Sequence, residues 1–190
     1  MQALYRLQLN ETPWQDLLIP LDGYRVGLYL QDQWQLHQNW TAVLGLRLDH
    51  NNVMRGTHLS PRAALIWQAD TNTTIKALYG HAYRVPNAYE MDYDDKVSQV
   101  ANLSLAAEHV DTYELVVERQ LTSTTKAGVS AFRWTMHGLV GLGLDTASGL
   151  PQFQSGPRVL ASGVEVTASG QVGAGGQWRS SVSWQDVGQS

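Results

Sequence analysis

The sequence predicts an all-β fold, an antiparallel up-and-down meander of about nine strands that forms an incomplete sector of a transmembrane β-barrel. Links between the strand-like segments alternate short and long, as do the turns and loops of an outer-membrane barrel. Charged residues make up only 16% of the 190 residues, against roughly 25% in soluble domains. No run approaches the ~18 apolar residues of a membrane helix. Low charge without such a run is typical of membrane strands whose two faces alternate.

The predicted strands follow one another along almost the whole chain. They lie at about residues 2–10, 24–36, 40–49, 58–69, 73–83, 109–120, 125–136, 157–169 and 176–187. Tight polar turns are predicted after every second strand, at 37–39, 70–72, 122–124 and 170–175. Long links are predicted after the first, third, fifth and seventh strands, and the longest runs from about Arg84 to Glu108. A soluble sandwich has no reason to sort its links by length, whereas a barrel with short periplasmic turns and long extracellular loops does.

The second and third strands show the period-two alternation of a half-exposed strand. In 24–36 the apolar face is broken only by Asp32, and in 40–49 every even-numbered position is apolar. The opposite faces are rich in Gln and Arg, which suits a hydrated interior. We therefore predict that one set of residues faces lipid, namely Leu44, Leu46 and Leu65, and that another faces the lumen, namely Gln31, Arg47 and Arg62.

The later strands differ in how clearly they alternate. Apolar residues occupy odd-numbered positions in 59–69 and 73–83, and Trp178 and Trp184 share a face of the last strand. The facing of 125–136 stays open, because one side is claimed by Ala127, Val129 and Ala131 and the other by Phe132, Trp134 and Met136. Seven Trp and eight Tyr against two Phe favour a membrane interface, where amphipathic rings are enriched. No helix with a 3.6-residue repeat is predicted.

Composition excludes several classes of protein. With no cysteine, the chain holds neither a disulfide framework nor a thiolate metal site. A net charge of −4 without a basic cluster argues against nucleic acid as a partner. The first residues lack the charged and apolar regions of a signal peptide, and an odd strand number is disfavoured in a closed single-chain barrel. We therefore expect a fragment of a longer exported protein.

Several stretches, in the same order along the chain, resemble one family. They are LQDQW (30–34), LGLRLD (44–49), SPRAAL (60–65), TIKALYGHAYRVPNAYE (74–90), NLSLAAE (102–108), TYEL (112–115) and SGVEV (162–166). As a set, these motifs resemble the barrel of TonB-dependent outer-membrane receptors. Residues Ala106 and Ala107 depart from the family pattern, which often has a proline just before the glutamate at 108.

The resemblance implies a receptor that takes up a scarce ligand across the outer membrane. An iron-siderophore complex is the commonest ligand class in the family, with cobalamin or haem as alternatives. The implied partners are outer-membrane lipid, the ferric siderophore and TonB, which acts on a plug domain. Nothing in residues 1–190 resembles that plug or a closing strand with a terminal aromatic residue. The expected piece is therefore the C-terminal half of the barrel without the plug, because a barrel of about 22 strands needs more than twice this length.

The candidate ligand-binding residues are weak and lie where the fifth strand runs into the longest loop. They are Tyr83, Arg84, Tyr89 and Glu90. Arg84 opens that loop and could contact a ligand. The more ordinary interpretation is a rim motif that ends the strand, because Pro86 cannot donate a ladder hydrogen bond. The sequence otherwise leaves the ligand site unknown.

No catalytic, cofactor or metal site is predicted. The six histidines lack a metal-ligand spacing such as H-x-x-x-H, and the glycine clusters lack the helix and Lys-Ser/Thr pair of a phosphate loop. Nothing resembles a G-x-S-x-G elbow. The acidic stretch 92–95 lacks the glycine and the final Glu of an EF-hand. The strand residues Glu114, Glu118 and Glu165 are expected to pair with Arg or Lys on the lumen side.

Two other functions stay open at this point. The chain could belong to a different outer-membrane barrel, such as a porin or an autotransporter translocator. It could also be a soluble β-sandwich or lectin-like module that stacks its tryptophans on sugar. Detergent dependence separates the second alternative, because a lectin module stays soluble and monodisperse without detergent.

Overall fold

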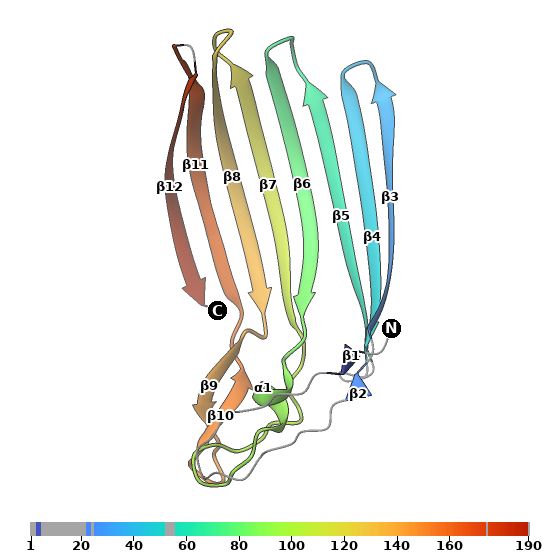
Figure 1. The fold of residues 1–190 in the computed structure, drawn as a ribbon, viewed down its shortest axis with the longest axis vertical. Helices are drawn as coiled ribbons and strands as arrows, with labels where there is room; N and C mark the ends of the chain where they lie inside the picture. The colour runs from blue at the N-terminus through green and yellow to red at the C-terminus, as the bar shows by residue number, and fades with distance from the viewer. Residues whose placement is uncertain (1–2, 5–21, 24, 52–55, 174, 190) are drawn as a thin grey trace.

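The computed structural model describes residues 3–4, 22–23, 25–51, 56–173 and 175–189. Eight strands form one antiparallel sheet in the order β12-β11-β8-β7-β6-β5-β4-β3, so the predicted meander is confirmed (Figure 1). The strands are β3 (Arg25–His37), β4 (Trp40–Asn51), β5 (Gly56–Gln68), β6 (Thr73–Arg84), β7 (Glu108–Gln120), β8 (Thr125–His137), β11 (Val159–Val172) and β12 (Gly176–Gln189). Over the described residues the sheet is open, with β3 and β12 at its two edges.

Eight of the nine predicted strands belong to this sheet, with their ends displaced by at most three residues. The first predicted strand, 2–10, lies mostly outside the described residues. Its described part, β1 (Ala3–Leu4), pairs with β2 (Asp22–Gly23) in a separate two-stranded sheet. The prediction therefore has the strand type and order right for the eight strands of the large sheet, and the rest of the first predicted strand lies outside the described residues.

The two ends of the sheet carry different connections (Figure 1). The four short turns lie together at one end, which we call the turn end, and the longer loops lie at the other, the loop end. One predicted long link is wrong, because β4 runs to Asn51 and β5 begins at Gly56. Pairing between these strands continues to that last position, so at most residues 52–55 separate them.

The sequence does not predict three elements at the loop end. They are α1 (Ala88–Asp92), β9 (Val140–Leu144) and β10 (Pro151–Ser155), of which β9 and β10 pair as an antiparallel hairpin. A helix of five residues is too short to show a 3.6-residue repeat. In the hairpin, glycines at 141 and 143 and glutamines at 152 and 154 stand where a strand usually has β-branched and aromatic residues.

Pairing register gathers the large apolar side chains of the sheet on one face. Leu46 pairs with Leu30, and Leu65 pairs with Ala77, which in turn pairs with Leu115. Leu44, Leu46 and Leu65 are 47%, 43% and 39% exposed, so no protein layer covers them. We call this the apolar face; it includes Leu30, Leu44, Leu46, Leu65, Leu115, Val129 and Val164. The predicted grouping of the three leucines is thus confirmed, and their contact with lipid stays a prediction.

The same register settles the facing of β8. Ala131 pairs with Leu115 on one side and with Val164 on the other, so it lies on the apolar face. Phe132 lies on the opposite face, where it pairs with Gly163. Its ring packs on Trp134 with 4.9 Å between the ring centroids. The two apolar sets of this strand therefore divide between the two faces of the sheet.

The opposite face of the sheet, which we call the polar face, carries charged and amide side chains that bond to one another. Arg47 donates to Asp49 through Nε at 2.6 Å and Nη2 at 2.8 Å, and Asp49 is fully buried. Lys76 Nζ lies 2.7 Å from Glu118 Oε2, which confirms the expected pairing of a strand glutamate with a lysine. Asp49, the buried carboxylate of these two pairs, thus has a cation beside it, which offsets the cost of burying its charge.

Gly45 makes room for a polar contact that crosses a whole strand, from β5 over β4 to β3. It lies between Gln31 and Arg62 in register, and Arg62 Nη2 donates to Gln31 Oε1 at 2.9 Å. A Cβ at position 45 would lie 2.7 Å from Arg62 Nε and 2.8 Å from its Cγ. Glycine therefore lets an arginine of β5 cross β4 and bond to a residue of β3.

A single sheet layer makes up most of the described structure. Among the described residues, the buried hydrophobic side chains are Leu105, Ala107 and Ala161, and no second sheet packs on either face of the eight strands (Figure 1). A β-sandwich needs two sheets packed about 10 Å apart, so the sandwich alternative does not fit. No helix in the described part of the chain is long and apolar enough to cross a membrane.

Candidate functional site

Residues 85–107 and 138–158 fold against each other at the loop end, and we call this assembly the loop cap (Figure 1). Hydrogen bonds join its two segments: Val100 N to Pro151 O (3.0 Å), Asn102 Nδ2 to Phe153 O (2.8 Å) and Gln152 Nε2 to Ala101 O (2.9 Å). Each bond links residues about fifty positions apart in the sequence. The two loops therefore form one structural unit.

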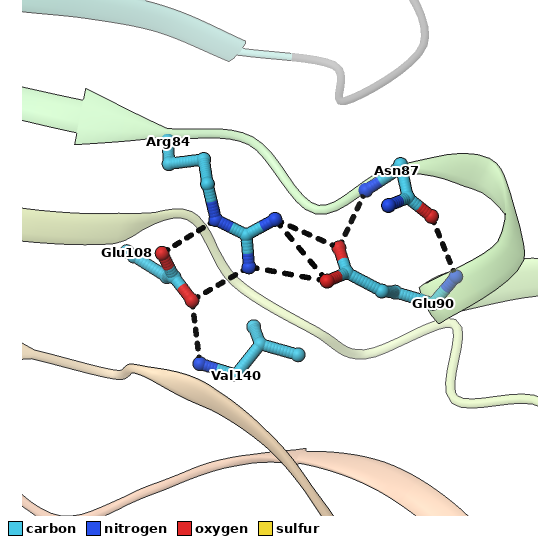
Figure 2. Close-up of polar contacts among 5 residues, drawn as sticks. All are labelled: Arg84, Asn87, Glu90, Glu108 and Val140. Atoms are coloured by element: carbon cyan, nitrogen blue, oxygen red, sulfur yellow. Dashed lines mark hydrogen bonds and ion pairs between the residues drawn. The ribbon is translucent and has the colours of Figure 1, made fainter.

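Arg84, the last residue of β6, anchors the loop cap to the sheet (Figure 2). Its Nε and Nη2 donate to the two carboxylate oxygens of Glu108 at 2.6 and 2.7 Å. Its Nη1 donates to Glu90 Oε2 at 3.0 Å and to Glu90 Oε1 at 3.1 Å. Paired charge-assisted bonds of this kind fix both distance and orientation.

The two carboxylates carry the connection from Arg84 into three further elements. Glu90 accepts from the backbone N–H of Asn87 at 2.8 Å, while Asn87 Oδ1 accepts from the backbone N–H of Glu90 at 2.9 Å. This reciprocal pair is a capping box that starts α1. Glu108, the first residue of β7, accepts from the backbone N–H of Val140 in β9 at 2.6 Å. One guanidinium thus ties β6, α1, β7 and β9 together (Figure 2).

We call Arg84, Glu90 and Glu108 the hub, and their charge arrangement gives Arg84 structural contacts. The Glu90 and Glu108 side chains are only 14% and 13% exposed, whereas Arg84 is 46% exposed. Two nearly buried carboxylates repel each other unless a cation lies between them. All the donors of Arg84 that point into the hub are already engaged by these carboxylates. Its placement agrees with the rim interpretation more closely than with a free ligand contact.

Tyr89 is the sequence candidate that remains open to a ligand. Its side chain is 49% exposed although its ring packs on two others, with centroids 4.9 Å from Tyr93 and 5.9 Å from Phe153. Its hydroxyl lies 3.5 Å from Gln99 Oε1. The three rings come from both segments of the loop cap, and such a cluster offers flat apolar surface with polar edges.

Tyr83 points elsewhere. Its ring stacks on His58 of β5, with 4.2 Å between centroids and planes 14° apart. The four sequence candidates therefore do not converge on one pocket. Arg84 and Glu90 form the hub, Tyr89 joins the aromatic cluster, and Tyr83 belongs to the contact between β5 and β6.

The acidic stretch at 92–95 supports a turn in the loop cap. Asp95 accepts hydrogen bonds from the Ser98 hydroxyl and from the backbone N–H groups of Val97, Ser98 and Gln99. These donors hold the pKa of the Asp95 carboxyl far below its ordinary range, with the Ser98 hydroxyl as the largest cause. Within the described residues, no group of three or more His, Asp or Glu is arranged to hold a metal ion.

Sequence reasoning misses part of the hub and all of a second cluster. The spacing Asn87-x-x-Glu90 is a capping-box signal and could have located α1. No sequence signal joins Glu108 to Arg84 or to Val140, because each contact depends on how the loops fold. Likewise, His58, His81 and His109 lie near one another but come from three different strands, so the search for a local H-x-x-x-H spacing could not find them.

Comparison with known proteins gives the same architecture. Residues 15–190 match the protein family described as TonB dependent receptor-like, beta-barrel. The iron-regulated outer membrane virulence protein of Vibrio cholerae is 27% identical over 110 residues, which are 57% of this chain and 17% of that protein. The chain thus spans about a sixth of the length of the curated relative it matches.

Solved structures share the fold at lower sequence identity. The siderophore receptor PirA from Pseudomonas aeruginosa superposes with a TM-score of 0.75 and 21% identity, over 88% of this chain and 35% of that one. A variant of the ferric enterobactin receptor PfeA from the same organism, in complex with enterobactin, superposes with a TM-score of 0.72 and 21% identity. The match covers 86% of this chain and 27% of that one. The FrpB iron transporter from Neisseria meningitidis superposes with a TM-score of 0.67 and 19% identity. The match covers 87% of this chain and 26% of that one.

Proposed function

Because the chain belongs to the TonB-dependent receptor β-barrel family, we propose that it supplies part of the wall of an outer-membrane receptor that takes up an iron-siderophore complex. The observation that carries the proposal is the family match over residues 15–190. The chain is accordingly an outer-membrane protein, and its relatives are receptors and transporters rather than enzymes. A porin or an autotransporter translocator does not account for the match.

The choice of ligand is supported by what the relatives are named for. The curated relative is iron-regulated, and two of the superposed structures are a siderophore receptor and a ferric enterobactin receptor. Ferric siderophores are therefore the ligand class to test first. Haem and cobalamin remain the alternatives within the same family.

The two faces and two ends of the sheet suit this role. We place the apolar face against lipid and the polar face toward the lumen, because an outer-membrane strand alternates in this way. We place the turn end in the periplasm and the loop cap outside the cell, since extracellular loops are the longer ones. TonB would act through a plug domain inside the barrel, so none of the residues described above is assigned to the contact with TonB.

Within the loop cap we assign ligand contact to the aromatic cluster of Tyr89, Tyr93 and Phe153. Tyr89 presents half of its surface to solvent, and its ring is held by the other two. Rigid aromatic side chains bind flat ligands at low entropic cost. Arg84, Glu90 and Glu108 hold the cluster in place and, in this assignment, do not touch the ligand.

Iron-limited growth of a strain that lacks the protein tests the proposal. Complementation with the intact gene should restore growth and labelled-iron uptake from at least one of a panel of catecholate and hydroxamate siderophores. Tyr89→Ala should lower that uptake, whereas Thr146→Ala, at an exposed position of the same cap, should leave it unchanged. Restored uptake of haem or cobalamin alone would reject the siderophore and keep the receptor class, and restored uptake of none would reject both.

A further inference from the structure

The loop-end halves of β6 and β7 carry two imidazoles whose ring nitrogens face each other. His81 of β6 pairs with Asp111 of β7, and His109 lies two positions along β7 from that aspartate. His81 Nε2 is 3.3 Å from His109 Nδ1, and the two ring centroids are 5.3 Å apart. The backbone ladder between the two strands continues past both histidines to Arg84 and Glu108. The sheet therefore fixes the spacing of the two side chains.

The two distances match a pair of imidazoles on one tetrahedral metal ion. With metal–nitrogen bonds of about 2.0–2.1 Å, such a pair has nitrogens about 3.3 Å apart and ring centroids about 5.2 Å apart. A straight N–H···N hydrogen bond of the same length would place the centroids farther apart. The contact is also long for a hydrogen bond, since donors and acceptors of well-formed N–H···O bonds lie about 2.7–3.2 Å apart. The geometry of His81 and His109 is thus closer to that of a chelate than to that of a strong hydrogen bond.

Asp111 fixes the tautomer and orientation of His81. His81 Nδ1 lies 2.9 Å from Asp111 Oδ1, and because an ionised carboxylate only accepts, this nitrogen carries the proton. The same carboxylate oxygen accepts from the Tyr79 hydroxyl at 3.0 Å. The lone pair of His81 is therefore on Nε2, the nitrogen that faces His109. A carboxylate that accepts from the other ring nitrogen is the usual support of a metal-binding histidine.

His109 can offer its lone pair without losing a proton. In the metal-free arrangement its Nδ1 donates to His81 Nε2. When an ion binds, the proton of His109 moves from Nδ1 to its other ring nitrogen, Nε2, and Nδ1 becomes a ligand. Both histidines then bind as neutral imidazoles, the form in which histidine is a metal ligand. The negative charge of Asp111 behind His81 partly balances the charge of the ion.

Space for the remaining ligands of the ion lies beside His81. This residue lines a hollow of about 330 Å³, and its side chain is 20% exposed. The hollow is also lined by two arginines. Of these, Arg47 is paired with Asp49, and Arg62 reaches across β4 to Gln31 on β3, away from β6. Water can therefore fill the coordination positions that the two imidazoles leave open, as it does in open tetrahedral zinc sites.

A third imidazole lies close by but is not assigned as a ligand. The ring centroids of His58 and His109 are 6.2 Å apart, which exceeds the roughly 5.2 Å of two imidazoles on one tetrahedral ion. Within the described part of the chain, no three His, Asp or Glu side chains are arranged around one ion. The arrangement therefore supplies two protein ligands, and a search for three-residue sites does not find it.

We propose that His81 and His109 chelate one divalent transition-metal ion, and that Zn²⁺ is the ion that fits best. Imidazole nitrogen suits zinc, copper and nickel. In a square-planar site two neighbouring nitrogens lie only about 2.8–3.0 Å apart, so the spacing of 3.3 Å favours tetrahedral Zn²⁺. Because β6 and β7 lead directly into the loop cap, a bound ion adds a link between the two strands that carry the cap. This site is separate from the aromatic cluster and does not depend on which siderophore is taken up.

Calorimetric titration with Zn²⁺ tests the chelate directly. The full chain, without a polyhistidine tag, is folded in detergent micelles, and heat-modifiable gel migration checks the fold of each variant. Wild type should bind one Zn²⁺ ion per chain. Co²⁺ bound in its place should give the intense visible absorption of a four-coordinate site. His81→Gln and His109→Gln should each lower the affinity for Zn²⁺ at least about tenfold, since losing a ligand costs no less than losing its outer support. Either variant suffices if the other fails to fold.

Two further variants separate the chelate from adventitious binding to surface histidines. His37→Gln, at the turn end of β3, should bind Zn²⁺ as wild type does. Asp111→Asn removes the negative charge behind His81 and should weaken binding about tenfold or more, as the loss of such outer partners does in other sites. Absence of saturable Zn²⁺ binding to wild type, an equal loss in His37→Gln, or wild-type affinity in both His81→Gln and His109→Gln would each overturn the proposal.

Discussion

At the scale of single residues, Arg84 shows how a site candidate becomes part of the scaffold. An arginine at the start of the longest loop is well placed to meet a ligand, and the sequence supports that possibility. In the structure it lies between two carboxylates that are 14% and 13% exposed. Its neighbours in the fold, rather than its place in the sequence, determine what it does.

Removing that guanidinium should release the loop cap. We expect Arg84→Ala to destabilise the cap by roughly 2–3 kcal/mol, because hydrogen bonds to charged groups are lost and two carboxylates are left facing each other. Hydrogen exchange in residues 85–107 should speed up, while exchange in β4 and β5 should not change. Arg158→Ala, at an exposed position, is the control and should leave both regions as they are. Equal exchange in Arg84→Ala and wild type would show that the hub does not hold the cap.

Gly163 gives a second residue-scale prediction. A Cβ at this position would collide with the carbonyl oxygen of Trp184 on β12 and lie 2.7 Å from Cζ of Phe132 on β8. Because one obstacle is backbone, the strands themselves must move. Gly163→Ala should therefore cost about 1–3 kcal/mol, as other overpacking changes do, and should lower the temperature at which heat-modifiable gel migration is lost. Gly141→Ala meets nothing within 4 Å, so an equally large loss there would refute the steric explanation.

At the scale of elements, the strands are predictable and the loop cap is not. Period-two alternation and polar turns locate β3 to β8, β11 and β12 because a strand with two different environments repeats every second residue. In β8 the pattern fails, since Phe132 and Trp134 put aromatic side chains on the polar face. The hub could not be predicted from the sequence for another reason, because Arg84, Glu108 and Val140 are brought together only by the folded loops.

The assignment of faces can be tested with one pair of neighbouring residues. Leu44 lies on the apolar face, while Val43 pairs with Gln33 and Ala64 on the polar face. An arginine on a lipid-facing strand position costs about 2–4 kcal/mol near the bilayer midplane. Leu44→Arg should therefore lower the yield and stability of the folded protein in outer membranes far more than Val43→Arg does. If both variants were tolerated equally, the apolar face would not be the lipid face.

At the scale of the whole molecule, the sheet has two different ends and two different faces. Short turns collect at one end and the loop cap at the other (Figure 1), while the large apolar side chains gather on one face of the strands and polar ones on the other. A structure with two distinct ends and two distinct faces suits a wall that separates two aqueous compartments and divides lipid from a wet lumen. The alternation of link lengths alone indicates this orientation, even though one of the long links predicted from it is absent.

Accessibility of two positions at opposite ends of the sheet tests this orientation most directly. Asn72 lies in a turn between β5 and β6, and Asp94 lies in the loop cap. Single cysteines at these positions are treated with a membrane-impermeant maleimide in intact cells and again after the outer membrane is permeabilised. The account predicts that Asp94→Cys is labelled in intact cells and Asn72→Cys only after permeabilisation. Labelling of both in intact cells, or of Asn72→Cys alone, would contradict it.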